Sequence, residues 1–521
     1  MPLSNHIDYA KLVRLAEKEG CQQSHITTPA YSSRYQVAEV PKFKMAESGM
    51  PPQAAYRMVH DELMLDGKPE LNCATFLTQW MEPEAEALIH ENINKNFVDV
   101  DGFPSSIAIH ERCISILAEL WGAPVSGQAQ GTVCGGSSEA LILGGLAMKW
   151  AWKKKCKESG RDDSKPNVVL GSNAHCCIEK FARYFDVDAR IVPVTVESNY
   201  VMDPKSCIAH CDENTIGVFS ILGSTYTGHY EDVLGLSDAL DKLQEKKGFD
   251  IPIHVDAASG GFIAPFATPD LNWDFGVKRV VSINTSGHKY GLVYAGLGWV
   301  VWKSKDYLHE DLIFQMHYLG APQRSFSLNF SRPSTHLIAQ YYNFVRLGQE
   351  GYRNAANGCL SNARFLSRAL EKSEMFDVLS RIHHKHPNKD FLPGIPLVAF
   401  TPSARFKELI PDIDVSDISG LIRTRGWMLP VYNLPQACQD TRILRVVVKE
   451  GMSRDLVARL IADIISACNS LMSNKEPRVT DPLFEVMALE CSEDPFIAKK
   501  LNTNPTQRHR KHVKNTFSSV C

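Results

Sequence analysis

The chain lacks the features of several large protein classes. No apolar run in its 521 residues approaches the length of a membrane span, and residues 1–20 contain no apolar signal core. A net charge of -3 argues against general nucleic-acid binding. The fourteen cysteines include neither a CxxC pair nor zinc-ligand spacing, and a chain of this length does not need disulfides. We therefore expect reduced thiols and a cytoplasmic protein.

The composition is that of a globular protein with room for two substantial cores. Hydrophobic residues make up 44% of the chain and charged residues 22%. Apolar runs alternate with segments of helical periodicity through the middle of the chain. Such alternation predicts a mostly parallel sheet whose ligand lies at the carboxyl ends of the strands. The predicted strands are 167–170, 190–196, 215–222 and the run ending at Asp256, and the predicted helices are 178–185, 204–210 and 233–246.

Lys289 lies in a turn between two apolar runs, 280–283 and 297–302, and is preceded by Ser286, Gly287 and His288. A lysine is rarely buried unless it is paired, but a lysine that forms an imine with the aldehyde of pyridoxal phosphate is uncharged at rest and can be enclosed. The pattern indicates a Schiff-base lysine. Taken alone, it is more typical of a surface lysine in a loop.

Asp256 ends a short β-rich run and is followed by two alanines, Ser259 and a glycine pair. Pyridoxal phosphate withdraws electrons effectively only while its ring nitrogen is protonated, so a carboxylate must face that nitrogen. Asp256 has a suitable place, and the small residues after it let a ring approach the backbone. An aspartate at a strand end is also a common turn former. Asp256 and Lys289 together favour the cofactor site.

A glycine-rich stretch, residues 131–136, runs through Ser137, Ser138 and Glu139 into the apolar-periodic segment 141–152. Free amides and hydroxyls at the start of a helix form a typical phosphate site, because the helix dipole is positive there. An ordinary helix cap would look similar. The upstream glycines favour phosphate.

The motifs around these residues resemble those of the pyridoxal-phosphate-dependent group II decarboxylases, most closely the glutamate decarboxylases. The resemblance extends from about residue 41 to about residue 471. It rests on these segments, in order along the chain: ELMLDGKPELNCATF, NINKNFVDVDGFP, GSSEA, LGSTYTGHYED, HVDAASGGFIAPF, SINTSGHKYGLVYAGLGWVVW and NFSRP. It implies a fold-type I transferase architecture, with a large α/β domain and a small carboxy-terminal one.

The resemblance also implies the rest of the cofactor site. Positions that the family places around the cofactor are occupied here by Ser137, Ser138, His175, Thr225, Asp256, Ala258, Ser286, His288, Lys289, Phe330 and Ser331. Of these, Ser331 reaches the phosphate across a subunit interface in the family. His175 departs from the glutamine common in bacterial and plant glutamate decarboxylases, and Cys134 with Gly135 replaces a bulkier pair.

The implied reaction is the loss of the α-carboxylate of glutamate as CO₂, giving 4-aminobutanoate. The family positions that bind the substrate are occupied by Thr75, Phe76, Asn96, Asp99 and Arg445, and the candidate acid at Cα is Tyr318. Asp99 would recognise the distal carboxylate as a protonated donor, because two neighbouring carboxyl groups share a proton. The alternative for Asp99 is a cap of the turn before Gly102, and the alternative for Arg445 is a structural ion pair.

We expect four regions: an N-terminal oligomerisation segment, 1–70, with helices near 8–19 and 54–65; a large domain, 71–345; a small domain, 346–473; and a mobile tail, 474–521. The large domain should include a helix near 83–92 and end in a long helix around 336–347. The small domain should contain strands 397–400, 426–429 and 443–448 and a helix at 455–471.

The expected partners are an amino-acid substrate and further copies of the chain, in a dimer at least or a hexamer as the larger alternative. No metal is expected. Calmodulin binding, which occurs in some plant relatives, is only weakly indicated because no tryptophan anchors the basic tail.

Two other interpretations stay open on the sequence alone. In the first, the chain is an enzyme that acts on another amino acid or cleaves a phosphorylated amino alcohol, which His175 and Cys134 slightly favour. Alternatively, it would be an inactive fold that serves as a binding or regulatory partner, which the intact Lys289, Asp256, His288 and Arg445 disfavour.

Overall fold

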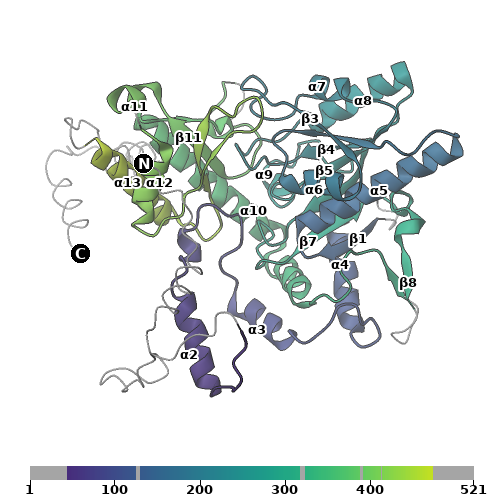
Figure 1. Ribbon diagram of the computed structural model, residues 1–521, viewed down its shortest axis with the longest axis horizontal. Coiled ribbons are helices and arrows are strands. Elements are labelled where there is room, and N and C mark those ends of the chain that lie inside the picture. The colour runs from purple at the N-terminus through teal and green to yellow at the C-terminus, as the bar shows by residue number, and fades with distance from the viewer. Residues whose placement is uncertain (1–43, 125–128, 317–322, 388–390, 412, 473–521) are drawn as a thin grey trace. The chain divides into compact units, whose positions relative to one another are not determined.

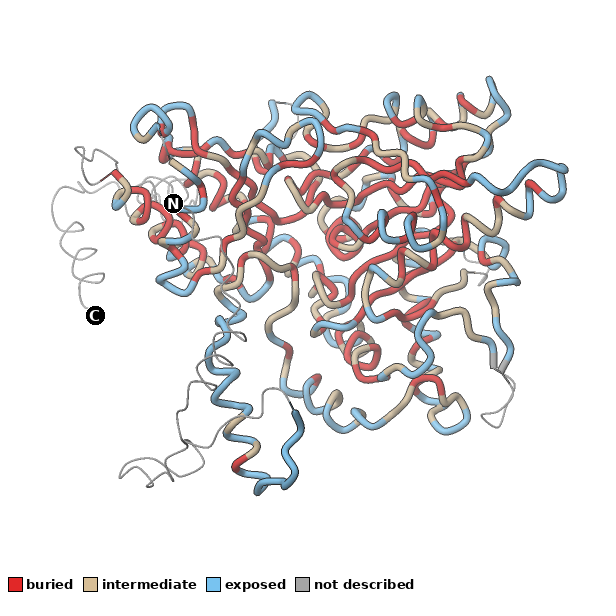
Figure 2. Tube along the Cα trace, in the orientation of Figure 1, coloured by how far each residue is buried: buried red, intermediate tan, exposed pale blue. Residues whose placement is uncertain are grey.

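A computed structural model describes residues 44–124, 129–316, 323–387, 391–411 and 413–472. The chain divides into two compact units, Met1–Lys68 and Pro69–Cys521. The described part of the first contains helix α2 (Pro52–Leu63), which confirms the helix predicted near 54–65. Proline suits its first turn, where the missing amide hydrogen is not needed. Figure 2 shows α2 as mostly exposed, with Ala54 buried. The helix predicted near 8–19 lies outside the described residues.

A seven-stranded sheet organises the second unit, in the order β1-β7-β6-β5-β4-β2-β3. Strands β6, β5, β4, β2 and β3 run parallel, whereas β7 is antiparallel to both of its neighbours. The predicted mostly parallel sheet is confirmed. Its strands are β1 (Gln130–Cys134), β2 (Asn167–Gly171), β3 (Asp188–Val192), β4 (Thr215–Ile221), β5 (Ile253–Asp256), β6 (Val280–Thr285) and β7 (Gly298–Trp302). Strands β4 to β7 are buried throughout, as is typical of the central strands of a mostly parallel sheet.

Helices flank this sheet (Figure 1). They are α4 (Pro104–Leu120), α5 (Ser137–Glu158), α6 (Cys176–Tyr184), α7 (Pro204–Ala209), α8 (Val233–Lys247) and the short α9 (Ala264–Ala267). Helix α3 (Pro83–Glu91) instead packs against the long helix α10 (Thr335–Lys372). Helix α5 packs across β4, β6 and β7, so its first turn lies at the carboxyl edge of the parallel strands. The predicted helices at 83–92, 178–185, 204–210 and 233–246 are confirmed with small shifts at their ends.

Helix α10 (Thr335–Lys372) connects this sheet to a second one. It changes direction at Gly348, whose φ of 58° is not helical. The second sheet is antiparallel, in the order β10-β11-β13-β12, with strands β10 (Phe376–Val378), β11 (Leu397–Pro402), β12 (Val431–Asn433) and β13 (Arg442–Val447). Helices α11 (Ala404–Leu409), α12 (Val415–Arg423) and α13 (Arg454–Leu471) follow β11 and β13 along the chain.

One predicted strand is wrong. Residues 426–429 form a turn, because Gly426 adopts a φ of 90° and only Met428 makes a bridge, to Asn72. The strand, β12, begins at Val431, two residues after the end of the predicted stretch. Helix α4 and the edge strand β1 were not predicted, since the glycine-rich stretch around β1 resembles a loop. The domain boundaries stay a prediction, and the one at 345/346 falls inside α10.

The remaining short elements are the ribbon of β8 (Phe314–Met316) and β9 (Gln323–Ser325), and four 3-10 turns at Pro69–Leu71, Lys305–Tyr307, Glu310–Leu312 and Arg381–His383. None of the described helices combines the length and the apolar character that crossing a membrane requires.

Candidate active site

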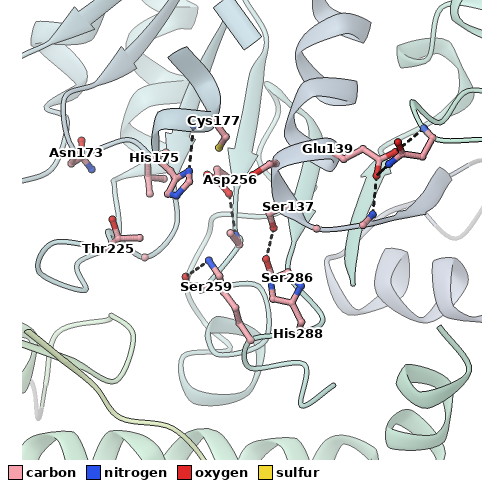
Figure 3. A pocket seen from close by; sticks show the side chains of 18 residues that line it. Ser137, Glu139, Asn173, His175, Cys177, Thr225, Asp256, Ser259, Ser286 and His288 are labelled. Carbon is pink, nitrogen blue, oxygen red and sulfur yellow. Dashed lines mark hydrogen bonds between the residues drawn. The ribbon is translucent and has the colours of Figure 1, made fainter. Parts of the chain in front are cut away.

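A cavity of about 530 Å³ opens where the parallel strands end. Asp256 is the last residue of β5, Ser286 follows β6, and Asn173 and His175 follow β2. Because the carboxyl ends of parallel strands meet at one edge, residues far apart in the sequence converge here. Figure 3 shows their side chains around the cavity. The lining comprises Gly135, Gly136, Ser137, Ser138, Glu139, Asn173, His175, Cys177, Ile221, Gly223, Thr225, Asp256, Ala258, Ser259, Ser286, His288, Lys289 and Asn329.

Lys289 reaches into this cavity from the turn after β6. The Thr78 hydroxyl donates a hydrogen bond of 2.8 Å to the Lys289 carbonyl, which ties the turn to the segment before α3. The Lys289 Nζ donates to Ser259 Oγ at 3.2 Å and lies 5.0 Å from the centre of the Phe76 ring. Burial lowers the pKa of Lys289, and the Asp256 carboxylate opposes that shift. The lysine is therefore closer to its uncharged, nucleophilic form than a surface lysine.

Asp256 is 4% exposed and faces the same cavity. Its Oδ1 accepts hydrogen bonds from Asn284 Nδ2 at 2.9 Å and from the Ala258 amide at 3.1 Å. Both hydrogen bonds found for this carboxylate among the described residues end on Oδ1. Its other oxygen, Oδ2, is thus available to a group inside the cavity.

The first turn of α5 closes another side of the cavity. Ser137 Oγ lies 2.6 Å from Ser286 Oγ, so hydroxyls from α5 and from the loop after β6 meet (Figure 3). Glu139 Oε2 accepts from the Gly135 amide at 2.8 Å and from Asn329 Nδ2 at 3.2 Å. These bonds hold the loop before α5 against the segment after β9. Amides and hydroxyls at the positive end of a helix of 22 residues have the chemistry to bind an anion.

Two histidines border the cavity. His175 caps α6, with its Nδ1 accepting from the Cys177 amide at 3.3 Å, and so presents its ring at the cavity wall. The Nδ1 of His288 accepts from the Leu297 amide at 3.1 Å. Burial, reinforced by the neighbouring Lys289, lowers the pKa of His288 to about 4. His288 is therefore neutral at neutral pH, and its remaining ring nitrogen carries the proton.

Arg445 of β13 approaches the cavity from the second sheet. It is 9% exposed, and it donates to the Thr225 carbonyl at 2.9 Å and to the Ala74 carbonyl. Its guanidinium lies 5.3 Å from the Phe76 ring centre and 5.4 Å from that of Tyr432. No carboxylate pairs with Arg445 among the described residues, and its Nε is buried without a hydrogen-bond partner there. The expected alternative of a structural ion pair is therefore not seen.

A second group of predicted residues lies together but does not line the cavity. Asn96 Nδ2 donates to Ser331 Oγ at 3.2 Å, and the Arg332 amide donates to Asn96 Oδ1 at 3.1 Å. Asp99 Oδ1 accepts from the Gly102 amide at 2.8 Å, which is the turn contact given above as the alternative for Asp99.

Four further predicted residues complete this account. Phe330 is 42% exposed beside Ser331. Thr75 is half-buried next to Phe76, and neither of these two residues lines the cavity. Tyr318 lies outside the described residues.

Several lining residues escaped the sequence analysis as candidates, among them Asn173, Cys177 and Ser259. Ser259 belongs to the same motif as Asp256, so the sequence could have indicated it as a neighbour of Lys289. Asn173 and Cys177 carry no local signal, because only the order of the strands brings the ends of β2 and β5 together.

Comparisons with known proteins agree with this geometry. Residues 46–391 match the family described as the pyridoxal-dependent decarboxylase conserved domain. Glutamate decarboxylase 5 of Arabidopsis thaliana is 48% identical over 443 residues, which are 85% of this chain and 86% of the relative.

Solved structures have the same fold. The glutamate decarboxylase of Lactobacillus brevis superimposes with a TM-score of 0.80 at 36% identity, covering 87% of this chain and 99% of that one. A sphingosine-1-phosphate lyase of Burkholderia pseudomallei shares the fold, with a TM-score of 0.69 at 20% identity, and covers 89% of this chain and 99% of its own. The chain therefore belongs to the pyridoxal-dependent decarboxylases, within the glutamate decarboxylase family.

Proposed function

We propose that this chain removes the α-carboxylate of L-glutamate as CO₂ and adds a proton at Cα, giving 4-aminobutanoate. The observation that carries the proposal is the enclosure of Lys289, Asp256 and the first turn of α5 around one cavity. A cavity of about 530 Å³ lies within the range that holds a small cofactor together with its substrate.

The residues present fit pyridoxal phosphate. Lys289 would hold its aldehyde carbon, Asp256 its ring nitrogen, and Ser137, Ser138 and Ser286 its phosphate, which the α5 dipole favours. When bound, the cofactor supplies an electron-withdrawing ring that stabilises the charge left at Cα. His175 would cover one face of the ring, and Thr225, Ala258 and His288 would border it.

Arg445 would bind the α-carboxylate of the substrate. A guanidinium binds a carboxylate through two parallel hydrogen bonds, and Arg445 is held beside the cavity by the Thr225 and Ala74 carbonyls. Fixing this carboxylate fixes the direction of the bond that breaks. Tyr318 remains the proposed donor of the proton to Cα.

The other end of the substrate would be held by Thr75, Phe76, Asn96 and Asp99. Asn96 contacts Ser331 in its own chain and does not line the cavity of that chain. We propose that Asn96, Asp99, Phe330 and Ser331 serve the cavity of a second copy, so that the active form is a homodimer or a larger assembly of dimers.

We also propose that the chain works in the cytosol. Every cysteine that the structure describes is a free thiol, as a reducing compartment would keep it. The tail, 474–521, lies outside the described residues, and calmodulin binding there stays a weakly supported prediction.

The test is an absorption spectrum of the purified protein with pyridoxal phosphate, followed by CO₂ release from glutamate, aspartate and an aromatic amino acid. We expect a visible band that Lys289→Ala abolishes, and CO₂ from glutamate alone. The variant should lower turnover by at least about a thousandfold, because the cofactor is then no longer held covalently.

Two outcomes would contradict the proposal in different ways. A visible band with CO₂ released only from another amino acid would keep the cofactor site and overturn the substrate. No band after reconstitution would leave the chain as a binding or regulatory protein with an inactive fold.

A further inference from the structure

Behind Asp256, a line of side chains runs away from the cavity into the sheet. His254 Nδ1 lies 2.7 Å from Ser282 Oγ, His254 Nε2 lies 2.7 Å from Asn284 Oδ1, and Asn284 Nδ2 donates to Asp256 Oδ1 at 2.9 Å. The four residues occupy alternate positions on β5 and β6, and the strand register pairs His254 with Ser282 and Asp256 with Asn284. Since alternate residues of a strand share a face, the sheet itself aligns them.

The hydrogen bonds in this line have one direction. A carboxylate only accepts, so Asn284 must turn its amide nitrogen to Asp256 and its oxygen to His254. The proton of His254 then lies on Nε2, and Nδ1 accepts from the Ser282 hydroxyl. Burial lowers the pKa of His254 to about 4, which agrees with a neutral ring of one tautomer.

The His254 ring has little freedom to leave this arrangement. His254, Ser282 and Asn284 are 0% exposed. Helix α5 passes so close that a Cβ on Gly144 would lie 2.4 Å from two atoms of the ring. The Phe219 ring meets it edge-on at 5.1 Å between ring centres. The donor on Nε2 is therefore fixed in direction as well as in tautomer.

We propose that His254 and Asn284 are positioning residues for Asp256. They keep Oδ1 bonded within the sheet and so turn Oδ2 toward the cavity, where the ring nitrogen of the cofactor would lie. The inference rests on the proposed function, because it assigns to Asp256 the role given there. Neither His254 nor Asn284 lines the cavity, so they act through Asp256.

The test compares His254→Leu with His254→Gln. Leucine removes the donor, whereas the glutamine amide reaches the place of Nε2 and still donates to Asn284. The readouts are the dissociation constant of pyridoxal phosphate, titrated into the cofactor-free full chain, and the pH midpoint of the visible band in the holoenzyme. Loss of a hydrogen bond that orients a charged group should weaken cofactor binding by about tenfold or more in the leucine variant. It should also move the pH midpoint.

The glutamine variant should stay within about twofold of the wild type in affinity, because the donor is restored although the ring is gone. Asn284→Ala, which removes the bond to Asp256 and leaves the His254 ring unchanged, provides the same test if His254→Leu does not fold. It should weaken binding by a similar factor.

Equal loss in the leucine and glutamine variants would show that packing of the ring matters and would overturn the inference. No loss in His254→Leu and Asn284→Ala would overturn it too, while leaving the proposed function intact. A wild-type chain that binds no pyridoxal phosphate would overturn the proposed function and the inference together.

Discussion

Arg445 uses both of its terminal nitrogens on main-chain carbonyls, those of Thr225 and Ala74, before any substrate arrives. Each of these nitrogens still has one hydrogen that can donate, so the bonds orient the group and leave donors for a carboxylate. We expect Arg445→Lys to raise the KM for glutamate by about tenfold to a hundredfold, because an ammonium cannot hold two carbonyls and a carboxylate in one plane. Steady-state kinetics measure this change.

Arg442→Lys is the matched control, on the same strand. Arg442 is exposed, bonds Asp414 at 2.6 and 2.7 Å and does not line the cavity. Its replacement should leave kcat and KM unchanged, since exposed ion pairs contribute about 0–1 kcal/mol. An unchanged KM in Arg445→Lys would refute the role of Arg445 in binding the substrate.

At this scale, the sequence predicted those site residues that carry a local chemical signal. Lys289, Asp256 and Ser137 stand in motifs whose composition has a physical reason, and all three line the cavity. His254 stands two residues before Asp256, but no pattern shows that Ser282 and Asn284 lie beside it. That contact depends on the register of β5 against β6, which a single sequence does not contain.

Helix α5 approaches the sheet closely at Gly144, and a substitution there tests how tightly the helix packs. Alanine normally stabilises a helix interior by about 1 kcal/mol relative to glycine. At Gly144 we expect the opposite sign, a loss of about 1–3 kcal/mol, because the added Cβ would meet His254 at 2.4 Å. The urea concentration at which half of the holoenzyme is unfolded shows whether the substitution raises or lowers the free energy of unfolding.

Gly358→Ala in α10 is the matched control for this substitution. A Cβ there has no heavy atom within 4 Å, so we expect a gain of up to about 1 kcal/mol. A gain at both positions would mean that α5 withdraws easily from β5 and that the space around His254 is not fixed.

Elements with a clear apolar pattern were predicted correctly, and elements without one were missed. The stretches 215–222, 280–283 and 297–302 are mostly apolar, and strands β4, β6 and β7 were found there. Strand β1 begins a glycine-containing stretch and was not predicted. The error at 426–429 has a related cause. Trp427 and Leu429 are buried like strand residues, but Gly426 turns the chain and the ladder with β13 begins only at Val431. Burial alone does not distinguish a strand from a buried turn.

For the whole molecule, the proposed second copy predicts complementation between two defective variants. Lys289→Ala lacks the lysine, and the double variant Asn96→Ala/Ser331→Ala lacks the residues proposed to serve the neighbouring cavity. Each alone should be nearly inactive. If the two are co-expressed, half of the dimers are hybrids with one intact site, so activity should recover to about a quarter of the wild type.

Different tags on the two variants, read by native mass spectrometry, establish that hybrids form. The control is co-expression of two differently tagged Lys289→Ala chains, which should show no recovery. Hybrids without activity would mean that Asn96 and Ser331 serve the cavity of their own chain, and the shared site would have to be abandoned.

The free cysteines have a practical consequence for following this fold. Burial raises the pKa of the thiols of Cys73, Cys177, Cys359 and Cys468 to about 12, and among the described cysteines only Cys176 is exposed and only Cys438 partly so. Because the thiolate is the reactive form, buried cysteines scarcely react until the chain around them opens. The buried cysteines lie in strand β1, in helices beside each of the two sheets and in loops next to them. The order in which a thiol reagent labels them should therefore show which regions open first, without the introduction of new cysteines.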